Sequence, residues 1–102
     1  MTKTSKRHAS ITPVHPGEIL REDVFPALGV TKPVLAGALG ISRQTLHDLF
    51  SEKRGVTPEM SLRLETVVGS TAETWLALQS ARDLWEVRRT AKVRSLKRLK
   101  AA

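Results

Sequence analysis

The sequence lacks cysteine, and its only aromatic residues are two phenylalanines and two tryptophans. The absence of cysteine excludes disulfide bonds, zinc–thiolate sites and thiol nucleophiles, and it is compatible with a reducing cytoplasm. With so few rings the core must be mainly aliphatic. No apolar run approaches the ~18 residues of a membrane-spanning helix, and no apolar stretch of a secretory signal follows the basic N-terminus. A chain of 102 residues is too short for a large catalytic scaffold.

The formal net charge of +7 is unevenly distributed along the chain. Residues 1–14 carry a net charge of +3, residues 15–87 carry −3 and residues 88–102 carry +7. Basic termini attract polyanions such as nucleic acid through counterion release, although a solvated, flexible end explains them equally well. Because the central region is slightly acidic, a prediction of DNA binding there needs a local motif.

Apolar residues recur at intervals of three and four, which predicts an all-α fold of five helices. Pro16 opens the first helix, and Pro26 is expected to end or kink it. The expected N-caps of the next four helices are Thr31, Ser42, Thr57 and Ser70, and the expected stops of the second and fourth are Gly40 and Gly69. The fifth helix carries Trp75 and Trp85 and could run on past Val93 and Leu96.

Residues 32–51 have the pattern of a helix-turn-helix motif. Ala36 is small where the next helix must cross, and Gly40 can take the positive φ of a tight turn. Ile41 and Leu46 are expected to fill the space between the two helices. A plain αα-hairpin has similar spacing, so the side chains on the outward face decide between the two interpretations.

The outward face of the helix after Ser42 favours DNA binding. In a major-groove helix the N-terminal outward residues reach base edges, where arginine suits guanine and glutamine suits adenine. We predict base contacts for Arg43, Gln44, Thr45 and His47, and phosphate contacts for Lys32, Ser42, Lys53 and Arg54. His47 could equally be a plain surface residue. Asp48 counts against binding unless it accepts from cytosine or restrains a basic side chain.

The remaining conspicuous residues have structural explanations. His15 is expected at the start of the first helix, because no partner lies at metal-ligand spacing. Trp75 and Trp85 share a helical face and are expected in core or dimer packing. Arg88–Lys100 is at best a basic amphipathic helix, for which binding to a membrane surface or a calmodulin-like protein is an alternative to a solvated tail. We expect no metal, no cofactor and no enzyme activity, since no catalytic constellation is present.

Three stretches make the sequence similar to the HigA-type antitoxins, which belong to the Xre group of helix-turn-helix regulators. They begin with His15-Pro-Gly-Glu, Leu39-Gly-Ile-Ser and Trp75-Leu-Ala-Leu-Gln, and together they span about residues 15–86. The resemblance implies a five-helix, lambda-repressor-like bundle with a long C-terminal helix. The expected parts are a flexible basic arm (1–14), a helix-turn-helix and dimerisation domain (15–86) and a basic tail or helix extension (87–102).

The resemblance also implies a function. A member of this group would form a cytoplasmic homodimer that binds palindromic operator DNA, represses its own operon and neutralises a HigB-type toxin, an mRNA-cleaving ribonuclease. No membrane partner is expected. Dimer packing would fall on the last helix, around Trp75, Leu78, Arg82 and Trp85. The alternatives are a stand-alone Xre-type regulator without a toxin, or an antitoxin that acts only through protein interaction.

Overall fold

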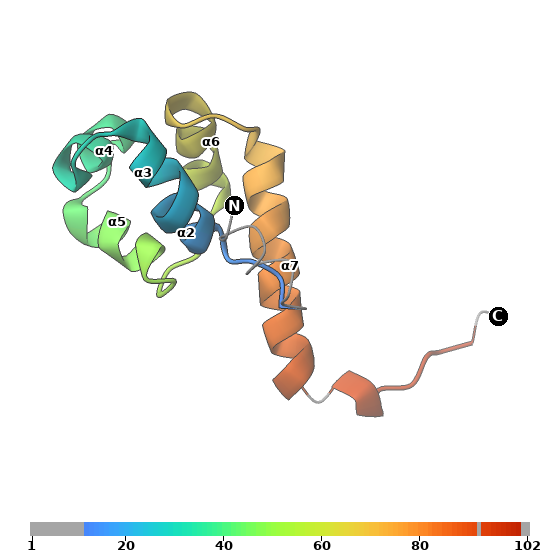
Figure 1. Cartoon of the computed structure of the whole chain (residues 1–102). Helices are drawn as coiled ribbons and strands as arrows, with labels where there is room; N and C mark the ends of the chain where they lie inside the picture. The colour runs from blue at the N-terminus through green and yellow to red at the C-terminus, as the bar shows by residue number, and fades with distance from the viewer. Residues whose placement is uncertain (1–11, 92, 101–102) are drawn as a thin grey trace.

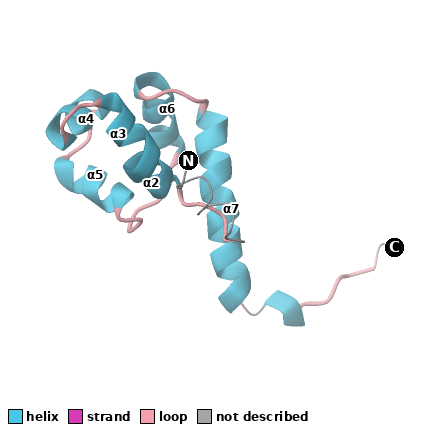
Figure 2. Ribbon diagram, in the orientation of Figure 1, coloured by secondary structure: helices cyan, strands magenta, loops and turns pink. Residues whose placement is uncertain are grey.

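The computed structural model describes residues 12–91 and 93–100, and every regular element among them is helical, as Figure 2 shows. The first helical run consists of α2 (Pro16–Ile19), the π-helical turn η1 (Leu20–Val24) and α3 (Phe25–Leu28). It is followed by α4 (Lys32–Leu39), α5 (Arg43–Phe50), α6 (Pro58–Val67), α7 (Ala72–Thr90) and the short 3-10 turn η2 (Val93–Ser95). The bundle has five helical runs, which confirms the predicted fold class. In Figure 1, α7 lies along one side of the bundle and extends beyond it.

The core is aliphatic apart from a few rings, as predicted. Its fully buried apolar side chains are Leu20, Leu35, Leu39, Leu46, Leu49 and Leu64. The ring of Phe50 meets that of Phe25 edge-on, with 5.4 Å between the ring centroids. Trp75 lies in the same core and donates its indole N–H to the carbonyl of Gly69 at 2.9 Å. Each large apolar side chain buried in this way contributes about 1.5–3 kcal/mol to folding.

Helical spacing alone overestimates the buried stripe. Val34, Leu62 and Leu84 have apolar spacing but are 56%, 57% and 49% exposed. These side chains lie beside the face by which each helix packs into the bundle. In a bundle this small, the neighbouring helices cover only a narrow strip of each helix. Among the described residues, no helix combines the length and the apolar character needed to cross a bilayer.

Most helix boundaries agree with the predicted capping residues. Thr31, Ser42 and Thr57 each accept a hydrogen bond from the backbone N–H three residues later. The cap of α7 was predicted one residue too early. Thr71, not Ser70, accepts from the backbone N–H of Thr74, at 3.1 Å. Ser70 instead has a φ of 62° and belongs to the turn that reverses the chain after α6.

The first helical run does not end at Pro26. The chain widens into the π turn η1 just before the proline, and the N–H of Phe25 bonds the carbonyl of Leu20. Pro26 then falls in the first turn of α3, where a missing N–H is tolerated. The run continues to Leu28 and ends at Gly29, whose φ is 67°.

The last helix is shorter than the sequence suggests. It stops at Thr90, and Ala91 has extended backbone with a ψ of 144°, so the chain does not continue as one helix past Val93 and Leu96. These two side chains are 56% and 73% exposed. An apolar stripe with nothing to pack against, in a segment of like charges, gives little support to further helix.

Candidate nucleic-acid interface

A side chain from α6 bonds the turn between α4 and α5. Gly40 has a φ of 71°, a backbone conformation that residues with a Cβ rarely adopt. Arg63 donates to the carbonyls of Leu39 and Gly40 at 2.9 and 3.3 Å, and its second nitrogen donates to Glu59 at 2.9 Å. A Cβ on Gly40 would lie 2.7 Å from the Arg63 guanidinium. The turn therefore needs glycine for its backbone angle, and a Cβ there would also displace the end of the Arg63 side chain.

The start of α2 packs directly against α5. A Cβ on Gly17 would lie 2.0 Å from the carbonyl oxygen of Leu49, which is backbone and cannot swing away. His15 caps α2 by accepting the Gly17 N–H at 2.9 Å through Nδ1. Its side chain is buried, and this burial lowers the pKa of His15 below its usual 6.5, which favours the neutral imidazole that an N-cap acceptor requires. The predicted place of His15, at the start of the first helix, is confirmed.

The C-terminal end of α5 is anchored by long-range bonds. Arg21 donates to the carbonyl of Phe50 and lies 3.5 Å from Glu52, which also pairs with Arg82 at 3.6 Å. The amide of Gln79 in α7 accepts the N–H of Val56 at 2.8 Å. These bonds hold the C-terminal end of α5 and the loop after it, and those of Arg63 hold the turn before it.

Arg21, Arg63 and Gln79 hold the helix-turn-helix in place, and the sequence analysis did not identify them. Their partners lie 23 to 31 residues away, so no local spacing points to them. One signal was available for Gln79, which lies four residues after Trp75, at a spacing that continues the buried face of the helix. A polar residue at a core position is normally bonded.

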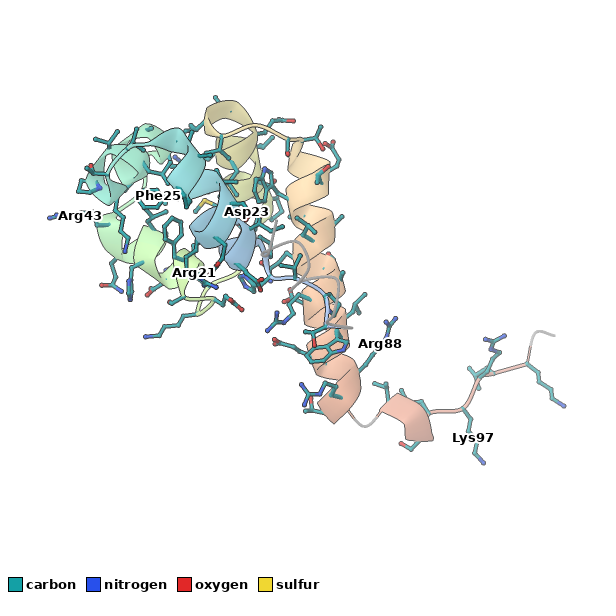
Figure 3. The ribbon with its side chains drawn as sticks, in the orientation of Figure 1. Arg21, Asp23, Phe25, Arg43, Arg88 and Lys97 are labelled. Carbon is teal, nitrogen blue, oxygen red and sulfur yellow. The ribbon has the colours of Figure 1, made fainter. Side chains whose placement is uncertain are left out.

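The outward face of α5 is free of the bundle. Arg43 and Gln44 are exposed at the first turn of the helix, and Figure 3 shows Arg43 directed away from all other helices. No described residue forms a hydrogen bond or ion pair with the Arg43 side chain. The amide of Gln44 donates to Asp48 at 2.8 Å. Asp48 therefore restrains the glutamine rather than a basic side chain.

The beginning of α5 is organised by its cap. The hydroxyl of Ser42 accepts the N–H of Thr45 at 3.0 Å and donates to the Thr45 hydroxyl at 2.9 Å. Ser42 is exposed and Thr45 is half-buried. Both side chains lie at the positive end of the helix dipole, beside Arg43, where an anion is favoured.

His47 and the three predicted phosphate contacts other than Ser42 lie in two places. Lys32, at the start of α4, and His47 line the same open cavity of about 450 Å³, together with Arg21 and the two phenylalanine rings. Lys53 and Arg54 are exposed in the loop after α5, where both backbone N–H groups donate to the carbonyl of Asp48. Basic side chains thus lie in a cavity that α5 helps to line and in the loop that follows α5.

Of the four predicted dimer residues, one is buried in the core and three are partly exposed. Trp75 is only 3% exposed, so it is occupied in the core of its own chain and offers almost no surface to a second copy. Leu78 is half-buried, and Arg82 bonds Glu86 at 2.7 Å and the Pro13 carbonyl at 3.2 Å. Trp85 is half-buried, and its side chain forms no hydrogen bond or ion pair among the described residues.

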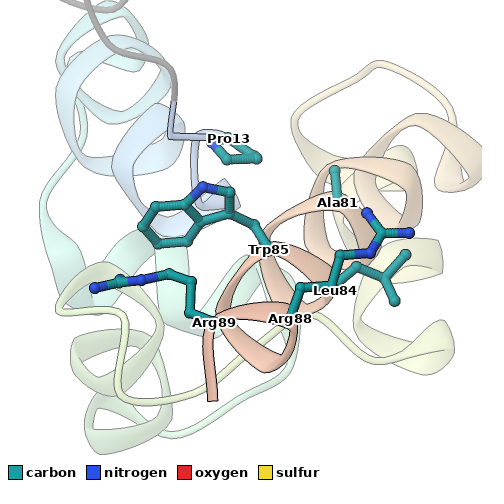
Figure 4. Close-up of a pocket in the computed structure, with 6 residues that line it drawn as sticks. All are labelled: Pro13, Ala81, Leu84, Trp85, Arg88 and Arg89. Carbon is teal, nitrogen blue, oxygen red and sulfur yellow. The ribbon is translucent and has the colours of Figure 1, made fainter. Parts of the chain in front are cut away.

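Trp85 borders an open groove of about 460 Å³ on the outer side of α7. Figure 4 shows its indole between Pro13 and Arg89, with Leu84 on the same stretch of helix. The guanidinium of Arg89 lies 4.5 Å from the centre of the ring, within the range of a cation–π contact. This groove, rather than Trp75, is the apolar surface that the last helix presents.

Comparison with known proteins agrees with this architecture. No protein-family model matches the chain. Antitoxin HigA-1 of Vibrio cholerae is 37% identical over 89 residues, which cover 86% of this chain and 78% of that protein. The chain belongs to the HigA family of helix-turn-helix antitoxins and regulators. Virulence-associated protein I of Dichelobacter nodosus is 41% identical over 71 residues, 70% of this chain and 66% of that protein.

One protein of similar structure has been solved as a complex with its operator. Antitoxin GraA in complex with its operator superposes with a TM-score of 0.79 and 38% identity, covering 90% of this chain and 96% of GraA. The HigA-type resemblance and the DNA-binding helix-turn-helix class predicted from the sequence are confirmed. Relatives of this chain are named as antitoxins and as transcriptional regulators, not as enzymes.

Proposed function

We propose that this protein is the antitoxin of a type II toxin–antitoxin pair. As a cytoplasmic homodimer it binds palindromic operator DNA and represses its own operon, and it neutralises a HigB-type toxin that cleaves mRNA. The observation that carries the DNA-binding part is the exposed guanidinium of Arg43 at the first turn of α5, which has no partner among the described residues. The operator complex of GraA, a protein of the same fold, supports it.

The site residues have distinct roles in this proposal. Arg43 and Gln44 read bases, and Asp48 fixes the glutamine amide in one orientation so that less side-chain entropy is lost on binding. Thr45 and His47 complete the base-contacting face. Ser42, Lys32, Lys53 and Arg54 bond phosphates and set the register of the helix in the groove.

The dimer places two copies of α5 about 34 Å apart, one turn of duplex. We assign the interface to the outer side of α7, where Leu84 is 49% exposed beside Trp85 and the groove. Leu84→Lys should convert the dimer to a monomer in analytical ultracentrifugation. Leu62→Lys, at a leucine that is 57% exposed on α6, should leave the dimer intact. A dimer that survives the Leu84 change would place the interface elsewhere.

Two assays test the proposal as a whole. A gel shift with the DNA upstream of the gene should show binding that excess random DNA does not abolish, and binding should weaken steeply with salt. Co-expression with the product of the adjacent open reading frame should relieve growth arrest caused by that product. Loss of the gel shift alone would leave an antitoxin that acts only through protein interaction.

A stand-alone regulator is the second candidate, because relatives such as YddM of Escherichia coli are named as HTH-type transcriptional regulators. It predicts the same gel shift but no relief of growth arrest and no complex with the neighbouring product. The co-expression result therefore separates the two functions, while the gel shift is common to both.

A further inference from the structure

The segment after the bundle is a dense run of positive charge without counter-charge. Residues 88–102 contain seven lysines and arginines and no acidic residue. Among the described residues, no carboxylate pairs with Arg88, Arg89, Lys97, Arg98 or Lys100. All five are exposed.

The path of the chain keeps these charges away from the bundle. The last turn of α7 already lies beyond the other helices, and Figure 1 shows the chain running outward after η2. Figure 3 shows Lys97 projecting from this outer segment. Leu96 and Leu99 are 73% and 91% exposed, so the segment does not pack onto the protein that carries it.

We propose that residues 93–100 form a DNA-binding arm, which contacts the backbone phosphates of duplex flanking the base pairs read by α5. This inference rests on the proposed operator binding. Like charges in an extended segment repel one another and gain most from a polyanion, because neutralising phosphates releases condensed counterions. Operator binding by α5 holds the arm near the neighbouring duplex, so each further phosphate is bound intramolecularly. The arm adds affinity and carries no base specificity.

Duplex DNA is favoured over other polyanions by this tethering. A single-stranded RNA or an acidic protein would have to reach the arm independently, whereas flanking duplex is supplied by the binding event itself. Binding of the arm to RNA or to an acidic protein would not depend on the length of the operator fragment. The experiment therefore distinguishes these two partners from flanking duplex.

The test compares two duplexes, the operator alone and the operator extended by one helical turn of unrelated sequence on each side. Wild-type protein should bind the extended duplex more tightly and with a steeper salt dependence. The variant K97Q/R98Q/K100Q should lose this advantage, with the slope of log K against log salt becoming shallower by about 0.9 for each phosphate that is no longer neutralised. The variant K97R/R98K/K100R, which keeps the charge, should behave as wild type.

The results separate the arm from the operator site. If K97Q/R98Q/K100Q keeps the full gain from the flanks, the arm does not touch DNA, while operator binding by α5 still stands. If binding weakens equally on both duplexes, the charges act through net charge alone and the inference is wrong. If single-stranded RNA displaces the arm more readily than flanking duplex does, the arm is an RNA site. If wild-type protein does not prefer operator over random DNA, the proposed function fails and the arm inference fails with it.

Discussion

The arginines of the bundle and those of its outer surfaces differ in their partners. Inside the bundle, Arg21 and Arg63 donate to backbone carbonyls near the ends of α5 and α4, and Arg82 pairs with acidic side chains. On the outside, Arg43 and the arginines of the last turn of α7 have no carboxylate partner among the described residues. The same type of side chain therefore positions the backbone in one region and lacks a carboxylate partner among the described residues in the other.

The distribution of acids explains this difference. All ten acidic residues lie between Glu18 and Glu86, so a basic residue in the bundle has carboxylates within reach and one in the tail has none. Arg43, like Lys32, Lys53 and Arg54, lies within the acidic region and still has no carboxylate partner among the described residues. Changes to bundle-facing groups should therefore alter stability, whereas changes to outward-facing groups should alter DNA binding only.

The largest effect on stability is expected at Gly17. Gly17→Ala forces a Cβ against the Leu49 carbonyl and should lower the free energy of unfolding by about 3 kcal/mol, at the upper end of typical overpacking costs. Urea denaturation measures it. Gly37→Ala is the control, since a Cβ there meets nothing within 4 Å and alanine favours helix, so it should stabilise by about 0.5–1 kcal/mol. Equal effects at both positions would show that α2 does not press on α5.

A smaller decrease is expected when the turn between α4 and α5 loses its brace. Arg63→Ala removes the bonds to the Leu39 and Gly40 carbonyls and should cost about 1–2 kcal/mol, discounted because the side chain is 38% exposed. Thermal or urea unfolding gives the value. Arg54→Ala, an exposed change, should stay within about 0.5 kcal/mol. If both arginines matter equally for stability, the contrast between bundle and surface is wrong.

The smallest effect concerns pH. Burial lowers the pKa of His15 in the folded chain, with Arg82 adding to the decrease and Glu52, Asp83 and Glu86 opposing it. The neutral form is thus favoured in the folded state. Its stabilising contribution is complete above the unfolded value of 6.5 and is lost as the pH falls below it.

His15→Asn provides the check, because asparagine can accept the cap hydrogen bond but does not titrate. Stability measured across this pH window should be flatter for the variant than for wild type. An unchanged profile would assign the pH dependence to other groups, such as the carboxylates around Arg82.

Local chemistry allowed much of this structure to be predicted. The caps Thr31, Ser42 and Thr57, the turn at Gly40 and the outward position of Arg43 all follow from short-range preferences. What could not be predicted depends on tertiary packing. The π turn that carries the helix past Pro26 and the reach of Arg63 across the turn are decided by how the helices meet.

The boundaries of α7 show the same limit at both ends. Ser70 and Thr71 are both good caps, and the turn geometry after α6 selects the second. At the other end, helical spacing continued through Val93 and Leu96, but no surface was available to bury them. Periodicity indicates which face is apolar and does not show whether a partner for that face exists.

The most direct test of the central claim is the binding of Arg43→Ala to operator and to random duplex at one salt concentration. If α5 reads bases through this arginine, the variant should lose about 1–3 kcal/mol on the operator, relax its sequence preference at one base pair and bind random DNA almost as wild type does. Unfolding by urea should be unchanged. An equal weakening on operator and random DNA would contradict the account, because it would make Arg43 a phosphate contact.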